Sequence, residues 1–401
     1  MHILTLSSLF PNPLMPVHAV FVRARMEAYT KQFGHDWTVV APIPYFPRFP
    51  FRKMGLYGIY ARVPREESPW GYPLYHPRYL VTPKVGMRFY GEWMARGVRD
   101  LVHSIHKERP IDLIDGHYIY PDGSAAVTMG RELGIPVILS ARGTDLNLYP
   151  HFPAVRKILS ANMQAASHVI CVCTELKVVA EKLGTPGNKI SVIGNGVDTA
   201  LFRAGDRDEA RRRLGLPMYK KIFLSVGGMT ERKGFHISIE AFANLKLRDG
   251  LLIIAGSGPE AEALARLAAN LGIKDQVLFP GAIGNSQLPP WYQASDYFIL
   301  ASSREGWPNV LCEAQACGLP SITTNAWGMP EIVSNAKLGI LVDARTVSDF
   351  GRALTQALVT EWDRKYISSV GSSRSWQTVG SSLEEVFQKA LRVGYDSTQP
   401  T

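Results

Sequence analysis

Residues 297–313 read YFILASSREGWPNVLCE and combine the parts of a strand-to-helix unit. The apolar run Tyr297–Leu300 predicts a buried strand. Pro308 is well placed as the first residue of the following helix, because proline is tolerated in a first helical turn. We then expect Glu305 in the loop at the carboxyl end of the strand and Glu313 on the inner turns of the helix. Units of this kind, repeated, build parallel sheets.

The same alternation of short apolar runs and longer amphipathic runs recurs along the chain. Strands are expected at Ile3–Leu6, Trp37–Val40, Leu113–Asp115, Val137–Ser140, Val169–Cys173, Ile190–Ile193, Ile222–Val226, Leu251–Ala255, Val277–Phe279, Tyr297–Leu300, Ser321–Thr323 and Gly339–Val342. Helices are expected between most of them. The alternation predicts an α/β protein with two doubly wound, Rossmann-like domains, residues 1–200 and 201–375. Ligands of such sheets bind beyond the carboxyl ends of the strands, so two facing domains would enclose a cleft.

The composition is that of a globular protein. With 46% apolar and 20% charged residues, the 401-residue chain is neither disordered, nor collagen-like, nor a disulfide-rich miniprotein. No apolar stretch reaches the roughly 18 residues of a membrane span. The net charge of +9 is uneven: residues 1–200 hold 22 Lys or Arg against 15 Asp or Glu, and residues 201–401 hold 22 against 20. This excess suggests that the first half has an anionic partner, which could be a nucleic acid, a membrane surface or a charged substrate.

The cysteines and the start of the chain indicate a cytoplasmic protein. Cys171, Cys173, Cys312 and Cys317 lack the spacing of a zinc site and are expected as buried thiols, which suits a reducing compartment. The first residues show no basic segment ahead of a long apolar stretch, so no secretory signal is expected.

Residues 43–99 interrupt the alternation and are rich in aromatic and basic residues. After Tyr45 they hold twelve further aromatic residues, and they hold ten basic residues against three acidic ones. One interpretation is an ordinary surface insertion. The other is a face for lipid headgroups or a lipid-linked substrate on the inner face of the membrane, because Arg, Tyr and Trp together suit a water–lipid boundary. A nucleic-acid surface is disfavoured, because no recognition motif accompanies the charge.

The start of the helix after Pro308 is a candidate anion site. The free amides of Asn309, Val310 and Leu311 are expected to carry the positive end of the helix dipole, which suits a phosphate. The carboxylates of Glu305 and Glu313 beside it could accept hydrogen bonds from sugar and ribose hydroxyls. On spacing alone, both glutamates could equally be surface charges at a helix terminus.

A glycine-rich turn follows the strand Ile222–Val226. Residues 227–234 read GGMTERKG, with glycines for close backbone approach and Lys233 for charge, which is typical of a phosphate-binding loop. The lysine spacing excludes a Walker A loop, and the glycine spacing is not that of a dinucleotide fingerprint. Taken alone, the glycines could be only a turn.

Polar residues also follow two neighbouring strands of the first half. His117 follows the strand Leu113–Asp115 and is expected to face the cleft, although a lone histidine is more often structural. Arg142 and Asp145 follow the strand Val137–Ser140 at the same height. Clusters at adjacent strand ends support each other as parts of one site.

Together these motifs resemble the retaining glycosyltransferases of family 4, which have the GT-B fold. The segments that carry the resemblance are Phe10–Pro13, Phe21-Val22, Asn195–Asp198, Gly227-Gly228 with Lys233-Gly234, Gly256–Pro259, Glu305 with Glu313, Ala316–Pro320 and Gly328–Val333. They span essentially the whole chain, and the paired-glutamate segment is the most specific. The residues around His117 and Pro121 look most like those of enzymes that build cell-surface polysaccharides.

The resemblance implies that the second domain binds a nucleoside-diphosphate sugar and the first binds the acceptor. Glu305 would contact hydroxyls of the donor sugar, and Glu313 the ribose diol. Lys233 would pair with the diphosphate, helped by the amides of Asn309 and Val310. Backbone groups near Gly281 and Ile283 would meet the base.

In the first domain, the resemblance implies that His117 lies beside the anomeric carbon. No metal and no further cofactor would be needed, because the lysine and the helix dipole neutralise the leaving diphosphate. The only Asp-x-Asp, at 206–208, is interpreted as a solvated helix start. A C-terminal helix at about 376–395 would cross back to the first domain. The acceptor would be a glycan or a lipid-linked saccharide, and not a nucleic acid.

The chain departs from the family pattern at three positions. Gly228 stands where the family usually has Arg or Asn, so one phosphate contact is expected to be missing. Ala19 and Trp327 stand where glycine is usual or frequent, and a methyl group at Ala19 could crowd the donor phosphate. Arg142 is not counted among them, because many relatives have His there but other relatives share the Arg.

Three other functions fit parts of the pattern. A phosphorylase or a sugar-nucleotide epimerase would share the fold, and would be revealed by a need for orthophosphate or by activity without an acceptor. A non-catalytic protein that binds nucleotide sugars would be consistent with Gly228 and Ala19. A nucleic-acid binder, which would bind with a steep salt dependence, has only the net charge in its favour.

Overall fold

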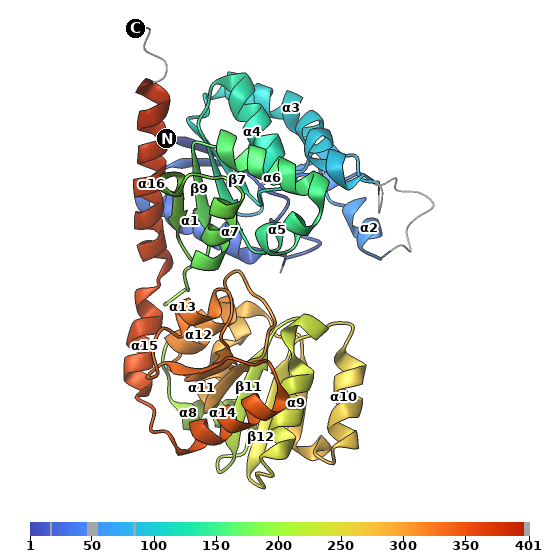
Figure 1. Cartoon of the computed structure of the whole chain (residues 1–401), viewed down its shortest axis with the longest axis vertical. Coiled ribbons are helices and arrows are strands. Elements are labelled where there is room, and N and C mark those ends of the chain that lie inside the picture. The colour runs from blue at the N-terminus through green and yellow to red at the C-terminus, as the bar shows by residue number, and fades with distance from the viewer. Residues whose placement is uncertain (17, 46–54, 83–85, 397–401) are drawn as a thin grey trace. The chain divides into compact units, whose positions relative to one another are not determined.

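The computed structural model describes residues 1–16, 18–45, 55–82 and 86–396 of the chain. It divides into two compact units (Figure 1). The first unit comprises residues 1–195 and the chain from Val379 onward, and the second unit comprises Gly196–Thr378. Each unit is built around its own, mainly parallel sheet, which confirms the predicted α/β class.

The second unit has the strand order of a doubly wound sheet. Its strands are β11 (Lys221–Val226), β12 (Gly250–Ala255), β13 (Val277–Gly281), β14 (Tyr297–Leu300), β15 (Ser321–Thr324) and β16 (Gly339–Val342). They run parallel in the order β13-β12-β11-β14-β15-β16. The chain builds outward from β11 in one direction and then in the other. The switch point between β11 and β14 is where such sheets hold ligands.

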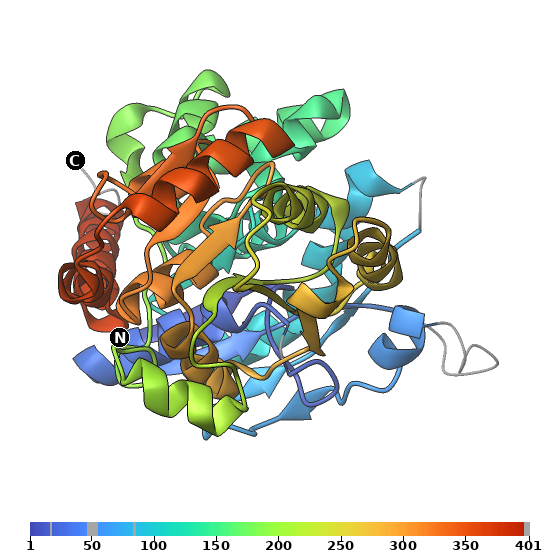
Figure 2. The same ribbon diagram turned by 90° about the horizontal axis from the view of Figure 1, so that it is seen from below.

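Helices cover both faces of this sheet, because neighbouring strand residues alternate between two cores (Figure 2). Phe223 and Leu252 point into one core, and Leu224 and Ile253 into the other. The first core also receives α9 (Phe235–Asn244), α10 (Ala261–Asn270) and α14 (Val347–Val359). The second receives α8 (Arg207–Leu214), α11 (Pro289–Ala294), α12 (Asn309–Ala316) and α13 (Met329–Ile332). Helix α15 (Arg364–Ser373) follows along the chain and packs on α12.

The first unit has a sheet with a switch point of its own. Its strands are β1 (His2–Leu6), β2 (Asp36–Val40), β4 (Glu66–Glu67), β5 (Leu74–Tyr75), β7 (Leu113–His117), β8 (Val137–Ala141), β9 (His168–Cys171) and β10 (Ile190–Val192). Their order is β10-β9-β8-β7-β1-β2-β5-β4, and all pairs are parallel except β4 with β5. The strand order reverses between β1 and β7.

The helices of the first unit are α1 (Val20–Phe33), α2 (Gly55–Tyr60), α3 (Tyr90–Glu108), α4 (Asp122–Leu133), α5 (Thr144–Asn147), α6 (Pro153–Ala165) and α7 (Thr174–Lys182). The last helix, α16 (Trp376–Asp396), begins in the second unit and packs on α1 (Figure 1). The Tyr29 hydroxyl donates a 2.5 Å hydrogen bond to Glu384, and the rings of Tyr29 and Phe387 lie 5.1 Å apart. This packing attaches the C-terminal helix to the first unit.

The segment 43–99 is only partly a separate insertion. It supplies β4 and β5 to the edge of the main sheet, and β3 (Ile43–Pro44) pairs with β6 (Arg78–Tyr79). The Trp70 ring lies under the Arg23 guanidinium at 4.2 Å, and Arg62 donates to a backbone carbonyl within the segment. Part of its basic and aromatic excess therefore stabilises the fold. Residues 46–54 and 83–85 of the predicted lipid-facing segment lie outside the described residues.

Two smaller predictions are confirmed. All four cysteines are buried free thiols. The Asp206 side chain caps α8 by accepting a 2.7 Å hydrogen bond from the Glu209 amide, so the Asp-x-Asp sequence is a helix start.

Candidate functional site

The loops after β11 and β14 are joined at the switch point of the second unit. These strands pair in the sheet, so their following loops, residues 227–234 and 301–308, are neighbours. The Ser303 amide donates to the Arg232 carbonyl at 2.9 Å, and the Arg232 guanidinium donates to the Arg304 carbonyl at 2.6 Å. The two loops that the sequence singled out therefore form one surface.

Lys233 and Glu305 meet on this surface as an ion pair. The Lys233 ammonium donates to Glu305 Oε1 at 2.6 Å, the Ser302 hydroxyl donates to the same atom at 2.9 Å, and Arg232 lies 2.9 Å from it. Burial by itself raises the pKa of Glu305, but the charges of Lys233 and Arg232 hold it below its usual value. Glu305 Oε2 has no partner among the described residues, so an ionised carboxylate presents one open acceptor.

Glycines allow the loops to approach this closely. Gly234 has a φ of 70°, and a Cβ there would lie 2.2 Å from the Ala301 carbonyl oxygen. A Cβ on Gly258, in the turn after β12, would lie 2.4 Å from the Met229 carbonyl oxygen. Gly228 differs, because its Cβ would meet only the Ser257 carbonyl oxygen, at 4.0 Å. The missing side chain at Gly228 therefore leaves open space.

The beginning of α12 differs from the prediction in two details. Pro308 precedes the helix as its cap residue, and the first helical residue is Asn309. The Leu311 amide is not free, because it donates to the Pro308 carbonyl at 2.9 Å, and its side chain is buried. The backbone turns tightly enough at Pro308 to satisfy this amide within the helix start. The predicted anion site thus loses the Leu311 amide.

Glu313, one helical turn further on, is partly buried in the second unit. The Tyr292 hydroxyl of α11 donates to Glu313 Oε2 at 2.8 Å. Burial raises the pKa of Glu313 to about 7, although hydrogen bonds from Tyr292 and Asn285 oppose the shift. Glu305 and Glu313 therefore have pKa values displaced in opposite directions, and the interpretation of both as surface charges is wrong.

The predicted base-binding residues lie at the end of β13. Gly281 has a φ of 82°, and its carbonyl accepts a 2.8 Å hydrogen bond from the Gly256 amide. The Ile283 side chain packs against the core that contains α11 and α12. The sheet thus places this turn beside the glycine turn that follows β12.

The switch point of the first unit joins the loops after β1 and β7. The Ser8 hydroxyl donates to the carboxylate of Asp122 at 3.0 Å, and the Ser8 amide donates to the same carboxylate. Burial raises the pKa of Asp122, the first residue of α4, to about 7. This carboxyl group ties the two loops together.

The sequence predicted that His117 faces the cleft. In the structure, His117 at the end of β7 is fully buried. Its Nε2 lies 2.6 Å from Asp115 Oδ2, and its Nδ1 accepts from Arg142 Nε at 3.1 Å. A carboxylate only accepts and a guanidinium only donates, so these partners assign the ring proton to Nε2. Burial lowers the pKa of His117 to about 4. His117 is therefore a neutral imidazole with both nitrogens occupied.

Arg142 and Asp145 belong to the same buried cluster. The Arg142 guanidinium reaches from His117 to the Asn195 side chain at 3.0 Å. Asp145 is completely buried and accepts from the backbone amides of Ile119 at 3.0 Å and Gly143 at 2.8 Å. The predicted cleft residue Asp145 is thus a brace between loops, because its oxygens are used by backbone amides.

Sequence reasoning missed Arg25, the most unusual member of this cluster. Its side chain is 1% exposed, and none of its three guanidinium nitrogens has a hydrogen-bond partner among the described residues. Asp115, with the unpartnered Oδ1, is the opposite charge that acts on it. The helical spacing of Val22, Met26 and Tyr29 places Arg25 on the buried stripe of α1, and this spacing was the available signal.

Three non-glycine residues adopt the left-handed backbone conformation in loops of the two clusters. They are Ala19 (φ 47°), Tyr118 (φ 87°) and Trp327 (φ 53°). Ala19 and Trp327 are positions where the family resemblance led us to expect glycine. These loops therefore keep a backbone conformation that suits glycine, and each of the three residues raises the conformational free energy by about 1 kcal/mol.

A cavity of about 180 Å³ lies at the carboxyl edge of the first unit's sheet. The loops after β1 and β2 line it with Leu9, Phe10, Asn12 and Ile43, together with other apolar and aromatic residues. Ser8, His18 and His76 also line it, so this pocket beside the Ser8–Asp122 contact has both polar and apolar walls.

Comparisons with known protein families cover both units. The sequence model described as glycosyl transferases group 1 matches residues 206–373, and that described as glycosyltransferase family 4 matches residues 20–201. The chain is 29% identical to the putative teichuronic acid biosynthesis glycosyltransferase TuaC of Bacillus subtilis, over 89% of each chain. It is 32% identical to the D-inositol 3-phosphate glycosyltransferase of Rhodococcus opacus, over 82% of this chain and 71% of the relative.

Solved structures share the fold. Sucrose-phosphate synthase from Thermosynechococcus elongatus has a TM-score of 0.77 at 18% identity, covering 98% of this chain and 99% of its own. Anabaena HepE in complex with UDP-glucose has a TM-score of 0.68 at 19% identity, covering 99% and 100%. The GT-B prediction is confirmed at the level of the fold.

Proposed function

The chain belongs to the group 1, family 4 glycosyltransferases, and we propose that it transfers a sugar, with retention of configuration, from a nucleoside diphosphate to a glycan or lipid-linked acceptor of polysaccharide synthesis. The observation that carries the proposal is the Lys233–Glu305 pair at the switch point of the second unit. One oxygen of an ionised carboxylate is held by three protein groups, and the other is left for a ligand.

The second unit is the proposed donor domain. Lys233 exchanges its contact with Glu305 for the diphosphate, assisted by the amides of Asn309 and Val310 at the positive end of α12. Glu305 Oε2 accepts from a hydroxyl of the donor sugar, and Glu313 accepts from the ribose diol. Gly281 and Ile283 contact the base through their backbone.

The reaction needs no protein nucleophile. The acceptor oxygen forms a bond to the anomeric carbon on the face from which the diphosphate leaves, so the configuration is retained. The bond between the anomeric carbon and the diphosphate oxygen breaks, and the acceptor proton passes to that oxygen. Lys233 and the α12 amides stabilise the charge that develops on the leaving group.

The first unit is the proposed acceptor domain. Its pocket of about 180 Å³ lies at the carboxyl edge, beside Asp122 and the loop that contains Ala19. His117, held by Asp115 and Arg142, is proposed to lie next to the reacting carbon once a substrate displaces Arg142. The name of the similar TuaC, which refers to teichuronic acid, favours a surface-polysaccharide acceptor.

Contact with a membrane is proposed through the basic segment 43–99. No helix in the described parts of the chain is both long and apolar enough to span a membrane. Among the described residues of the segment, Tyr45, Leu80 and Phe89 are exposed large apolar side chains. With the basic residues around them, they suit an interface with anionic headgroups.

A thermal-shift panel of nucleoside diphosphates and their sugars tests the donor assignment. A ligand that binds only the native state raises the melting temperature, so one base should stand out, and its sugar nucleotide should then support transfer. Glu313→Gln should weaken the shift, and the exposed Glu262→Gln should not.

The proposal fails if no nucleotide stabilises the protein. It also fails if turnover requires orthophosphate or needs no acceptor, because these results indicate a phosphorylase or an epimerase. Binding of a nucleotide sugar without hydrolysis or transfer to any acceptor would indicate a non-catalytic binding protein.

A further inference from the structure

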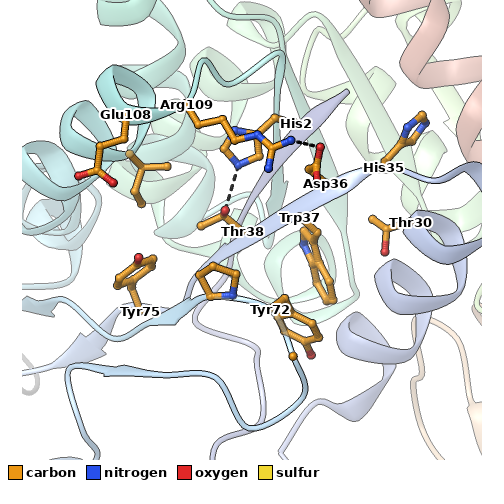
Figure 3. Close-up of a pocket in the computed structure, with 13 residues that line it drawn as sticks. His2, Thr30, His35, Asp36, Trp37, Thr38, Tyr72, Tyr75, Glu108 and Arg109 are labelled. Carbon is orange, nitrogen blue, oxygen red and sulfur yellow. Dashed lines mark hydrogen bonds and ion pairs between the residues drawn. The ribbon is translucent and has the colours of Figure 1, made fainter.

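A second cavity of the first unit lies at the edge opposite to the candidate site. Its volume is about 420 Å³, within the usual range of ligand pockets. His2 begins β1 and Asp36 begins β2, and both line the cavity (Figure 3). It is thus at the amino ends of the strands whose carboxyl ends lead to the pocket beside Ser8. The strands have five residues, so the two pockets are separated by about 17 Å.

The polar groups on the floor of the cavity already have hydrogen-bond partners. His2 and Trp37 are buried there, with His2 Nε2 2.9 Å from the Thr38 hydroxyl and the Trp37 indole donating to Thr5. Tyr72 stands against Trp37, with 4.2 Å between ring centroids, and donates its hydroxyl to Glu27. These residues form a rigid, partly aromatic surface whose polar groups need no hydrogen bond from a ligand.

The rim differs, because it keeps unused hydrogen-bonding groups. The Tyr75 hydroxyl makes no hydrogen bond with the described residues, and Glu108 accepts only from Ser104, at 3.2 Å to Oε1. Asp36 and Arg109 form an exposed ion pair, in which more than half of each side chain is accessible. Figure 3 shows Tyr75, Glu108 and Arg109 around the opening. The rim therefore offers a phenol, a carboxylate and a guanidinium.

We propose that this cavity is a carbohydrate-binding subsite for a glycan, separate from the reaction site. The Tyr75 ring can lie against the apolar face of a sugar ring, and the Tyr75 hydroxyl and the Glu108 carboxylate can bind sugar hydroxyls. The alternatives fit less well. A phosphate group would need an unpaired cation, but Arg109 is paired with Asp36, and Glu108 lies beside it. A flat base would need an open slot, but the faces of Trp37 and Tyr72 lie against each other.

The subsite extends the proposed function, because it names a glycan longer than one sugar as the molecule bound. A monosaccharide cannot occupy pockets about 17 Å apart, whereas an oligosaccharide can engage the subsite while its end reacts elsewhere. The expected benefit is additional affinity for long acceptors, with no effect on the donor.

Glycan binding by the full chain tests the subsite directly, without any donor. The probes are an array of hexose, N-acetylhexosamine and uronic acid oligomers, followed by calorimetry with the tetrasaccharides that bind. Tyr75→Phe and Glu108→Gln should each weaken tetrasaccharide binding three- to tenfold, and Tyr75→Ala with Glu108→Gln more than tenfold. The matched control is Tyr219→Phe, on the second unit, where the tyrosine is 74% exposed. Melting temperatures establish that each variant folds.

Two results overturn the subsite. One is that no oligomer of the array binds. The other is that an oligomer binds with equal affinity to the wild type and to the double variant. If the oligomer binds as expected but no nucleotide stabilises the protein, the subsite stands and the proposed transfer fails. If nucleotides bind and oligomers do not, only the subsite fails.

Discussion

The polar cluster of the second unit leaves hydrogen-bonding capacity for a ligand, whereas in the first unit the side chains of His117, Arg142 and Asp145 are engaged internally and the unpartnered atoms, on Arg25 and Asp115, are buried. Glu305 has one occupied and one open oxygen, and Lys233 can exchange partners. Both ring nitrogens of His117 make hydrogen bonds, and the carboxylate of Asp145 accepts hydrogen bonds from backbone amides. Both clusters occupy equivalent places, at the switch point of a doubly wound sheet.

This difference separates two uses of buried charge. In the second unit, opposite charges keep a carboxylate ionised so that it can accept from a substrate. In the first unit, Asp115 orients a neutral histidine, and two arginines compensate its charge in the interior. We infer that the second cluster acts mainly by binding and the first mainly by positioning, and four predictions test the comparison.

The largest effect is expected from the Lys233–Glu305 pair. Glu305→Ala and Lys233→Ala should each reduce kcat by about 10²–10³-fold, because each removes a group that acts on the transition state. Neither should unfold the protein, because other hydrogen bonds also join the two loops that carry the pair. Steady-state kinetics measures kcat, and circular dichroism establishes that each variant is folded. Glu262→Gln is the matched control. Wild-type turnover in both variants, with every donor, would show that the site is assigned wrongly.

A loss of stability is expected in the first unit. Asp115→Asn leaves Arg25 and Arg142 buried without their counter-charge, so the free energy of unfolding should fall by about 3 kcal/mol. The affinity for nucleotide should not change, because the proposed donor site is in the other unit. Urea unfolding and calorimetry measure the two quantities, with the exposed Asp100→Asn as control. An unchanged unfolding free energy would mean that Asp115 does not stabilise the cluster.

Glu313 should make stability depend on pH. Its pKa is about 7 in the folded protein and lower when unfolded, so the folded state binds the extra proton between about pH 4.5 and 7. Its contribution is complete below pH 4.5 and is lost as the pH rises through 7. The unfolding free energy of the wild type relative to Glu313→Gln should therefore fall by about 3 kcal/mol between pH 4.5 and 8. A constant difference would contradict the assigned shift.

The smallest effect is expected at Gly228. The space around this residue is open, so Gly228→Arg should add a cation near the diphosphate and lower the donor KM about three- to tenfold. Gly228→Ala introduces a side chain without charge and should leave KM unchanged. An equal response in both variants would show that this position does not approach the phosphates.

Local patterns were sufficient to predict the second cluster from the sequence. Lys233 and Glu305 each lie in the loop that follows an apolar strand, and the parallel pairing of β11 with β14 makes these loops converge. The strands were also predicted well, because residues buried on both faces form continuous apolar runs. The error at Leu311 concerns one hydrogen bond at a helix start, which depends on the backbone angles at Pro308.

The first cluster could not be predicted to the same depth. His117 and Arg142 were identified as candidates, but their contact joins residues on different strands, 25 positions apart. Arg25 lies on a helix whose pattern is compatible with either a surface or a buried arginine. The carbohydrate subsite has no local signal at all, since its lining comes from β1, β2, β5 and the end of α3.

The sequence by itself determined the α/β class, the doubly wound topology, the family and the residues of the polar cluster of the second unit, because periodicity, glycine spacing and strand-end position are properties of short segments. Only the tertiary structure decided which of those residues are open to a ligand, which are consumed by internal hydrogen bonds, and where the second pocket of the first unit lies. Burial, hydrogen-bond partners and pKa values depend on atoms that folding brings together from distant parts of the chain, so no short segment can reveal them.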